Sequence, residues 1–178
     1  GAALAGTATV SAVNGVATFT DLRIDKAGTG YTLTASSGSL TSAVSSSFNV
    51  SAAAASTLVL TSEPSTTVAG EAFDTQPVAQ VQDAYGNVIT SSSASVTASI
   101  TTGTGTSGAT LSGSTPVSAS SGIATFSGLS IDKSGSGYTL TFSSTGLTSA
   151  VSSGFSILSA SASTLAFSVQ PSGGTAGD

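Results

Sequence analysis

Few side chains in this sequence could perform acid-base, nucleophilic or redox chemistry. The 178 residues include no His, Cys, Met or Trp, and only 3 basic and 8 acidic residues. The commonest general base, disulfides and thiolate or imidazole metal ligands are therefore all missing. Two carboxylates held around a cleft would remain as a catalytic device, but the acids fall mostly in apparent turns. We expect a protein that is not an enzyme and that uses no cofactor.

The turn from Asp83 to Asn87 is the strongest candidate for a binding site. Its sequence, Asp-Ala-Tyr-Gly-Asn, combines a carboxylate, an amide and backbone carbonyls, which are the oxygen ligands that calcium prefers. Asp83 and Asn87 are thus weak candidates for metal ligands. The alternative is that both side chains hydrogen-bond the backbone of their own turn, as Asp and Asn commonly do. Because calcium needs about six to eight converging oxygens, we favour this second interpretation.

Two further hypotheses involve the same turn. Glu63, Glu71 and Asp74 precede it in the part of the chain where adjoining domains would meet, so these acids could complete an interdomain calcium site. Alternatively, Lys133 could form an intramolecular isopeptide bond with Asn87, catalysed by a buried acid. Nothing in the sequence brings either set of groups together, and the hydrogen-bonded turn stays the preferred interpretation.

Two features bear on glycans. Asn49-Val50-Ser51 matches the N-glycosylation pattern, which makes Asn49 a weak candidate, although the corresponding position later in the chain is Ser156. O-linked sugar on the many Ser and Thr residues is the better hypothesis. Tyr85 lies on a turn and is the one tyrosine expected to be free for contact with a sugar.

The composition indicates a neutral, hydroxyl-rich surface. Charged residues make up 6% of the chain, against roughly 25% in an average soluble protein, whereas 38 residues are Ser and 28 are Thr. The net charge is -5 and no basic stripe is present, so we expect neither nucleic acid nor a membrane surface as partner. The longest run of small residues, Ala52 to Ala55, is too short for membrane insertion.

A long internal repeat organises the chain. The segment that begins GVATFTDLRIDKAGTGYTL at Gly15 returns as GIATFSGLSIDKSGSGYTL at Gly122, which places the two copies 107 residues apart. Over the whole overlap, 40 of 71 positions are identical. We therefore predict three parts: residues 1–54 as the C-terminal part of one repeat, residues 55–161 as a complete repeat, and residues 162–178 as the first strand of a following one. Each copy of the Ile-Asp-Lys motif, at Asp25-Lys26 and Asp132-Lys133, is expected to form a local ion pair or turn cap.

The complete repeat predicts an all-β domain. Short runs alternate apolar and small polar residues, which is typical of half-buried strands, and Gly-rich turns separate them. We expect seven to nine strands in two packed sheets, with a core that includes Val81, Ile100, Phe126, Tyr138 and Phe142. A period of 107 residues exceeds that of solenoid repeats, and it is close to the size of an independently folding sandwich of roughly 100 residues.

A family resemblance rests on three stretches of the complete repeat. These are PVAQVQDAYGNVI from Pro77 to Ile89, SVTASI after it, and SSGIATFSGLSIDKSGSGYTLTFSS from Ser120 to Ser144. Together they resemble the bacterial Ig-like domains of invasin- and intimin-type adhesins and of giant surface proteins. The resemblance implies an all-β, immunoglobulin-like β-sandwich in tandem repeats of 107 residues, and a secreted or cell-surface protein.

We predict that the chain is a structural repeat: a spacer, stalk or filament subunit of a large bacterial extracellular or cell-surface protein. The alternative is an adhesion or carbohydrate-binding Ig-like module, whose loops would differ between copies. In the overlap most differences are exchanges among Ser, Thr, Ala and Gly, which favours the spacer. The expected partners are neighbouring repeats, other copies of the chain in a fibre, and glycans.

The N-terminal part is expected to expose apolar side chains. Half of a sandwich would leave the inner faces of its sheets open, including Phe19, Leu22, Ile24, Tyr31 and Leu33. A second chain would cover these residues in a fibre, whereas they would face solvent in an isolated chain.

Overall fold

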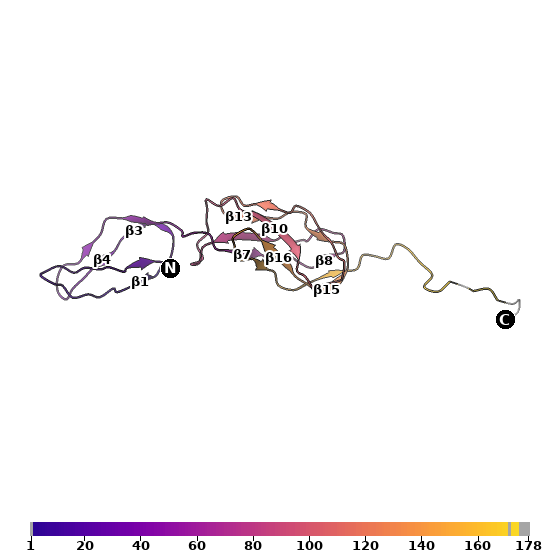
Figure 1. Ribbon diagram of the computed structural model, residues 1–178, viewed down its shortest axis with the longest axis horizontal. Helices are drawn as coiled ribbons and strands as arrows, with labels where there is room; N and C mark the ends of the chain where they lie inside the picture. The colour runs from indigo at the N-terminus through magenta and orange to yellow at the C-terminus, as the bar shows by residue number, and fades with distance from the viewer. Residues whose placement is uncertain (1, 171, 175–178) are drawn as a thin grey trace.

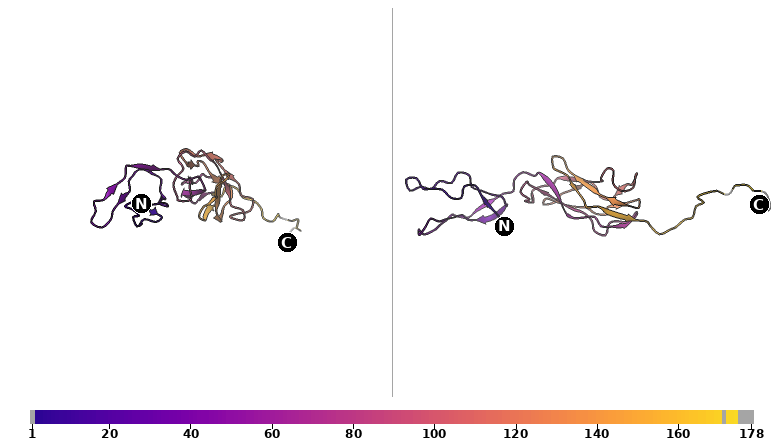
Figure 2. Two further views of the ribbon diagram at one scale, coloured as in Figure 1. Left: turned by 60° about the vertical axis from the view of Figure 1, so that its left-hand side comes forward. Right: turned by 90° about the horizontal axis from the view of Figure 1, so that it is seen from below.

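The computed structural model describes residues 2–170 and 172–174, and these residues form strands and no helix. The molecule is elongated (Figure 1), and Figure 2 shows the same arrangement from two further directions. We distinguish an N-terminal segment (residues 2–54), a central unit (residues 57–158) and a C-terminal tail (residues 159–170). The N-terminal strands are β1 (Leu4–Ala5), β2 (Arg23–Ile24), β3 (Gly28–Tyr31), β4 (Thr34–Ala35), β5 (Ala43–Val44) and β6 (Phe48–Val50).

The central unit contains twelve strands in a β-sandwich-like arrangement. The strands are β7 (Thr57–Ser62), β8 (Thr67–Val68), β9 (Val78–Gln82), β10 (Ser95–Ile100), β11 (Leu111–Ser112), β12 (Val117–Ser118), β13 (Ile123–Thr125), β14 (Ser130–Ile131), β15 (Gly135–Tyr138), β16 (Leu140–Ser143), β17 (Ala150–Val151) and β18 (Phe155–Leu158). One sheet has the order β13-β9-β7, a second has the order β12-β10-β16-β17, and a third has the order β15-β18-β8. Strand β11 pairs with β14.

All pairings between these strands are antiparallel except that of β8 with β18, which is parallel. Twelve strands exceed the expected seven to nine because regular pairing is interrupted within longer extended segments. The register shifts between Gly135 and Tyr138, and β15 ends at Tyr138 before β16 begins at Leu140. The two pieces then pair with different partners, β18 and β10.

The core of the central unit is apolar and aromatic, and the expected core is largely confirmed. Val81, Phe126, Tyr138 and Phe142 are each at most 1% exposed. The rings of Phe126 and Phe142 meet edge to face with centroids 5.1 Å apart. Ile100 is only half-buried, because it is the last residue of β10, where the chain enters the Gly- and Thr-rich loop. The other buried apolar residues are Leu58, Phe73, Ala79, Val96, Ala98, Ala119, Ala124, Leu129, Ile131, Leu140, Phe155 and Ile157.

The N-terminal segment repeats the pairings of the central unit. Strand β1 pairs with β2, β3 with β6, and β4 with β5, in the registers of β11–β14, β15–β18 and β16–β17 displaced by 107 residues. Side-chain bonds recur too, since the Tyr31 hydroxyl donates to the Lys26 carbonyl and the Tyr138 hydroxyl to that of Lys133. Local sequence therefore dictates the same hairpin-like pairings in both places.

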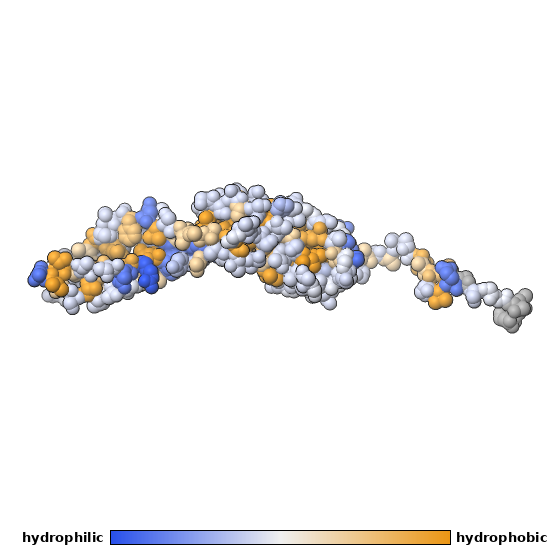
Figure 3. All heavy atoms as spheres, in the orientation of Figure 1, coloured by the Kyte–Doolittle hydropathy of each residue, from blue (hydrophilic) through white to orange (hydrophobic). Residues whose placement is uncertain are grey.

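Burial separates these two parts of the molecule. Phe19 is 41% exposed, whereas Phe126 at the equivalent position is 1% exposed. Tyr31 is half-buried while Tyr138 is fully buried, in part because Gly105 lies directly over the Tyr138 ring with a positive φ of 65°. Figure 3 shows the apolar residues that remain at the surface of the N-terminal segment. Five apolar residues of this segment were expected to be exposed; Phe19 is exposed, whereas Leu22, Ile24, Tyr31 and Leu33 are half-buried.

Candidate functional site: the junction at Asp83

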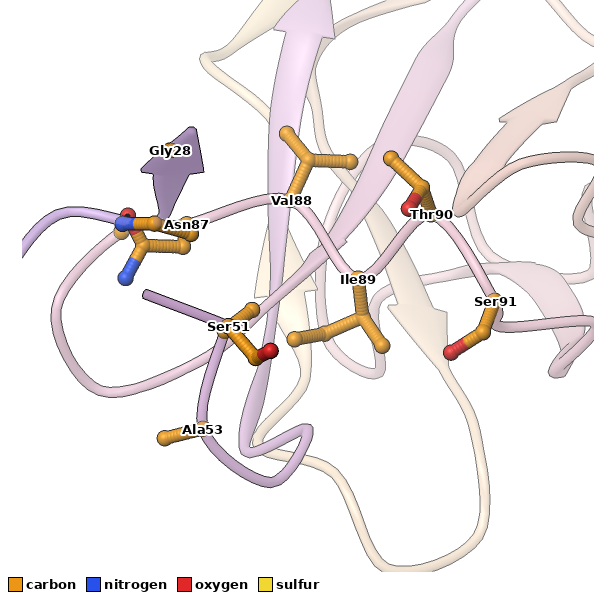
Figure 4. Close-up of a pocket in the computed structure, with 11 residues that line it drawn as sticks. Gly28, Ser51, Ala53, Asn87, Val88, Ile89, Thr90 and Ser91 are labelled. Carbon is orange, nitrogen blue, oxygen red and sulfur yellow. Dashed lines mark hydrogen bonds between the residues drawn. The ribbon is translucent and has the colours of Figure 1, made fainter. Parts of the chain in front are cut away.

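The turn from Asp83 to Asn87 lies where the N-terminal segment meets the central unit. Strand β9 ends at Gln82 and leads directly into this turn. Residues 27–28 and 51–53 approach it from the preceding segment (Figure 4), and residues 25 and 26 contact it. The N–H of Gly86, which has a positive φ of 76°, donates to the Asp83 carbonyl at 3.1 Å and closes the turn. Glycine is suited to this position because other residues adopt positive φ at a cost.

Asp83 is the centre of the junction. Its side chain is 1% exposed, and its carboxylate accepts four hydrogen bonds, all at 2.9 Å. Oδ1 accepts from the N–H groups of Tyr85 and Asn87, whereas Oδ2 accepts from the N–H of Ala53 and from Nδ2 of Asn87. Three of these bonds stay within the turn. The fourth ties the turn to the segment that connects the two parts of the chain.

The ionisation of Asp83 reflects this environment. Burial disfavours the charged carboxylate and raises its pKa, but the hydrogen bonds from Asn87, Ala53 and Tyr85 favour the charged form more strongly. The net result is a pKa lowered from 3.8 to about 2. The group is therefore an anion at neutral pH, and all its donors are in place.

Asn87 carries the contact to the N-terminal segment. Its Nδ2 donates to the Asp25 carbonyl at 2.9 Å, and its Oδ1 accepts from the N–H of Ala27 at 3.0 Å. Lys26, between these two residues, donates from Nζ to the Tyr85 carbonyl. Three consecutive residues of the N-terminal segment, Asp25, Lys26 and Ala27, thus hold the Asp83 turn.

The contacts of Asp83 and Asn87 are those of a hydrogen-bonded turn. Four N–H groups point at the carboxylate, and a cation at the same oxygens would have to displace them. Among residues 2–170 and 172–174, no three His, Cys, Asp or Glu side chains gather in a group that could hold a metal ion. Glu63, which was considered for an interdomain calcium site with Glu71 and Asp74, instead accepts a hydrogen bond from the N–H of Ser153 at 3.1 Å.

Of the remaining candidates, Lys133 and Asn49 lie apart from the turn, and Tyr85 is part of it. Lys133 donates to the Ser107 carbonyl at 3.3 Å, while Lys26, its counterpart in the earlier copy, is the lysine beside Asn87. Asn49 is exposed and accepts a hydrogen bond from the N–H of Gly30. The Tyr85 side chain is 56% exposed, so its ring is free for contact although its carbonyl is bound by Lys26.

The aspartates of the two Ile-Asp-Lys motifs tie down neighbouring strands. Asp25 Oδ1 accepts from the N–H of Ala3 at 2.9 Å, and Asp132 Oδ1 accepts from the N–H of Thr110 at 2.7 Å. These hydrogen bonds are the main reason that the pKa of each carboxyl is lowered. Neither aspartate is seen in an ion pair with the adjacent lysine. Each aspartate instead caps a backbone N–H that lies 22 positions earlier in the chain.

A shallow hollow of about 660 Å³ adjoins the turn. Its lining has no acidic or basic side chain and no nucleophile stronger than a hydroxyl, so it offers no acid-base chemistry. Figure 4 shows the side chains around it. The lining residues are Ala27, Gly28, Ser51, Ala52, Ala53, Gly86, Asn87, Val88, Ile89, Thr90 and Ser91.

Sequence reasoning identified Asp83 and Asn87 but not their partners in the N-terminal segment. Asp25 and Asn87 are 62 positions apart, and no spacing rule links a turn to a loop at that distance. One signal was available: the Asp-Lys pair recurs at the same phase of both sequence copies, shortly before strands β3 and β15. A motif that recurs in this way could have been tested as a contact between parts of the chain.

Comparison with known proteins adds no relative. No protein-family model matches the chain, and no curated protein matches it. Within the part of the chain that the structure describes, no helix could cross a membrane.

Proposed function

We propose that this chain is a structural segment of a large extracellular or cell-surface protein, in which Ig-like repeats act as a spacer or stalk and a hydrogen-bonded junction stiffens each connection. The observation that carries the proposal is the junction itself. Asn87, Lys26 and Ala53 provide four hydrogen bonds between the Asp83 turn and the preceding segment. A flexible tether would need none of them.

The strand pairings support the Ig-like part of the proposal. Strand β9 pairs with β7 and β13, and β10 pairs with β16, while β8 pairs in parallel with β18. These contacts match an arrangement in which strands A, B and E form one sheet and strands C, F and G form the other. The start of the central unit crosses from one sheet to the other between β7 and β8.

The surface and the sites also favour a structural role without catalysis. Asp83, the one buried acid among the described residues, uses its carboxylate to hold the chain together. The chain lacks Cys, so its folding outside the cell needs no disulfide formation. A neutral surface rich in Ser and Thr suits side-by-side packing with glycans or other copies, because few charges would have to be desolvated.

The test compares two double variants by small-angle X-ray scattering. Lys26→Met with Asn87→Ala removes three of the four hydrogen bonds between the parts. Lys133→Met with Asn49→Ala changes the same residue types at sites whose contacts do not cross the junction. We expect the control to scatter as the wild type does, and the junction variant to show a broader distribution of interatomic distances. Identical scattering from all three proteins would contradict a stiffening role for the junction.

A further inference from the structure

The outer face of the sheet β12-β10-β16-β17 in the central unit is made of hydroxyl side chains. Alternate residues of these strands, such as Val96, Ala98 and Phe142, point inward and are buried. The residues between them point outward, and all but Val151 are Ser or Thr. We call this set the hydroxyl face; it comprises Ser95, Thr97, Ser99, Ser118, Thr141, Ser143 and Val151.

The strand register arranges these side chains as an even array. Thr97 lies beside Ser143 on the neighbouring strand, and Ser99 lies beside Thr141, which in turn lies beside Val151. Strands in a sheet are about 4.8 Å apart, and alternate residues of one strand are about 6.6 Å apart. The face therefore presents small side chains of one kind at regular spacing in both directions.

Most of these hydroxyls are free to bind a partner. The Ser99 hydroxyl donates to the Thr141 carbonyl at 3.5 Å, and the Thr141 hydroxyl is bonded to that of Thr101 at 2.8 Å. The other Ser and Thr side chains of the hydroxyl face make no hydrogen bond to any residue that the structure describes. No buried side-chain polar atom in this part of the chain lacks a partner, so the unpaired hydroxyls are open to solvent.

The same outward residues recur in the other sequence copy. Along β16, β17 and the residues that flank them, every outward position has the residue type found 107 positions earlier. The pairs are Thr139 and Thr32, Thr141 and Thr34, Ser143 and Ser36, Ser149 and Ser42, Val151 and Val44, and Ser153 and Ser46. Strands β4 and β5 also pair in the register of β16 and β17. The inward position Phe142, by contrast, corresponds to Ala35, so the outward pattern persists where the core position differs.

The chemistry of the hydroxyl face makes it complementary to itself. Each hydroxyl can donate or accept a hydrogen bond, so two such faces can pair their side chains in either relative direction. A charged face would instead repel its own copy. None of the outward residues is charged, and Glu63 reaches only the edge beyond β17, where it accepts from the N–H of Ser153. The face thus suits a neutral partner that presents hydroxyls of its own.

We propose that the hydroxyl face binds the hydroxyl face of a second molecule of this chain, so that two molecules pack side by side. Stacked sheets meet face to face at about 10 Å, and the hydroxyls that lose water in this contact pair with each other across it. The inference goes beyond the proposed spacer role and does not depend on the Asp83 junction. A stiff junction could exist in a protein that never associates, and the reverse also holds.

The size of the face predicts a weak, reversible contact. Four strands span about 19 Å across the sheet, and the six residues of β10 extend about 20 Å along it, which gives at most about 400 Å². A standard interface buries about 800 Å² on each partner. One pair of faces therefore associates in the millimolar range, and a chain that repeats the face gains affinity from the added contacts.

The first experiment follows amide chemical shifts as the wild-type chain is concentrated to about 1 mM. We expect the amides of β10 and β16 to shift with concentration, while those of β13, β9 and β7 on the other sheet stay unchanged. Sedimentation velocity on the same samples should show the monomer of 16.8 kDa in exchange with a dimer. Shifts that are absent, or that fall on β13, β9 and β7, would overturn the proposal.

The second experiment compares two double variants with equal added charge. Thr34→Lys with Thr141→Lys places lysines on the hydroxyl face of both sequence copies, and like charges across the contact should weaken association at least about tenfold. The control is Thr18→Lys with Thr125→Lys, which changes exposed threonines at equivalent positions outside the face. It should associate as the wild type does. An equal loss of association in both variants would contradict the assignment of the face.

A mixing experiment separates repulsion from misfolding. Chains with Thr34→Glu and Thr141→Glu should also fail to associate alone. Mixed with the lysine chains Thr34→Lys and Thr141→Lys at low salt, they should associate again, because opposite charges then meet across the two faces, and added salt should reverse this recovery. A mixture that stays monomeric at low salt would show that the hydroxyl face does not meet its own copy.

Thr141 and Thr125 both point away from the core of the central unit. All the double variants should therefore unfold at the temperature of the wild type within a few degrees.

Discussion

Replacing Asn87 by Ala should release the N-terminal segment from the Asp83 turn without unfolding the central unit. The substitution removes three side-chain hydrogen bonds, two of which reach the N-terminal segment at Asp25 and Ala27. The turn itself keeps its backbone bonds, because the N–H of Asn87 still reaches Asp83 Oδ1 and the Asp83 N–H still reaches the carbonyl of residue 87. Asn87 does not have a positive φ, so Ala adopts the same backbone without strain.

The expected magnitude follows from the two bonds that cross the junction. A net hydrogen bond contributes about 1 kcal/mol, so losing two weakens the contact by about 2 kcal/mol, or roughly 30-fold. Hydrogen exchange of the Ala53 amide reports this opening, since its bond to Asp83 Oδ2 crosses the junction and neither partner is changed by the substitution. We expect the Ala53 amide to exchange about 30-fold faster in the Asn87→Ala variant.

The matched control is Asn49→Ala, which removes a side-chain acceptor from the N–H of Gly30 within the N-terminal segment. This variant should accelerate exchange at Gly30 and leave Ala53 as in the wild type. Unchanged exchange of Ala53 in Asn87→Ala, or equal acceleration of Ala53 in both variants, would refute the idea that Asn87 holds the junction.

Further predictions concern the core, pH and metal. Phe126→Ala should cost about 3 to 5 kcal/mol of unfolding free energy in a denaturant titration, whereas Phe19→Ala should cost well under half of that, because only Phe126 is fully buried. The pKa of Asp83 is lowered to about 2 from 3.8, so the stabilisation that the carboxylate provides is present above pH 4 and is lost as pH falls through about 4 to 2. Hydrogen exchange of the Ala53 amide, measured as the pH is lowered, checks this prediction. The Asp83→Asn variant should not show the pH dependence. Chelation by EDTA should leave the melting temperature unchanged, and a drop that calcium reverses would support a metal at Asp83 instead.

The strands and core were predictable because they depend on local pattern. Alternation along residues 138–142 places Tyr138 and Phe142 on one face, and both are fully buried. Ile100 follows the same alternation but is half-buried, since burial also depends on what covers the end of a strand. The twelve short strands were not predictable, because a register shift such as that between Gly135 and Tyr138 follows from the packing of two extended segments against each other.

The sequence predicted the Asp83 turn but not all of the residues that contact it. The Asp83 turn has a local signature, with Asp, Gly and Asn at suitable positions for its own hydrogen bonds. Two of its partners, Asp25 and Ala27, could not be derived, because they contribute backbone groups, which every residue carries. Their selection depends on how the two parts of the chain pack. Only Lys26 reaches the turn with its side chain, and it belongs to a motif that recurs in the sequence.

Residual dipolar couplings test the central claim, that the Asp83 junction makes adjoining parts of the chain move as one body. Amide couplings would be measured for residues 23–50 of the N-terminal segment and for residues 57–158 of the central unit in one alignment medium. A stiff junction predicts that both sets fit a single alignment tensor of the same magnitude and orientation. A tensor for the N-terminal residues that is reduced by independent motion, while the central unit keeps its full alignment, would contradict the account.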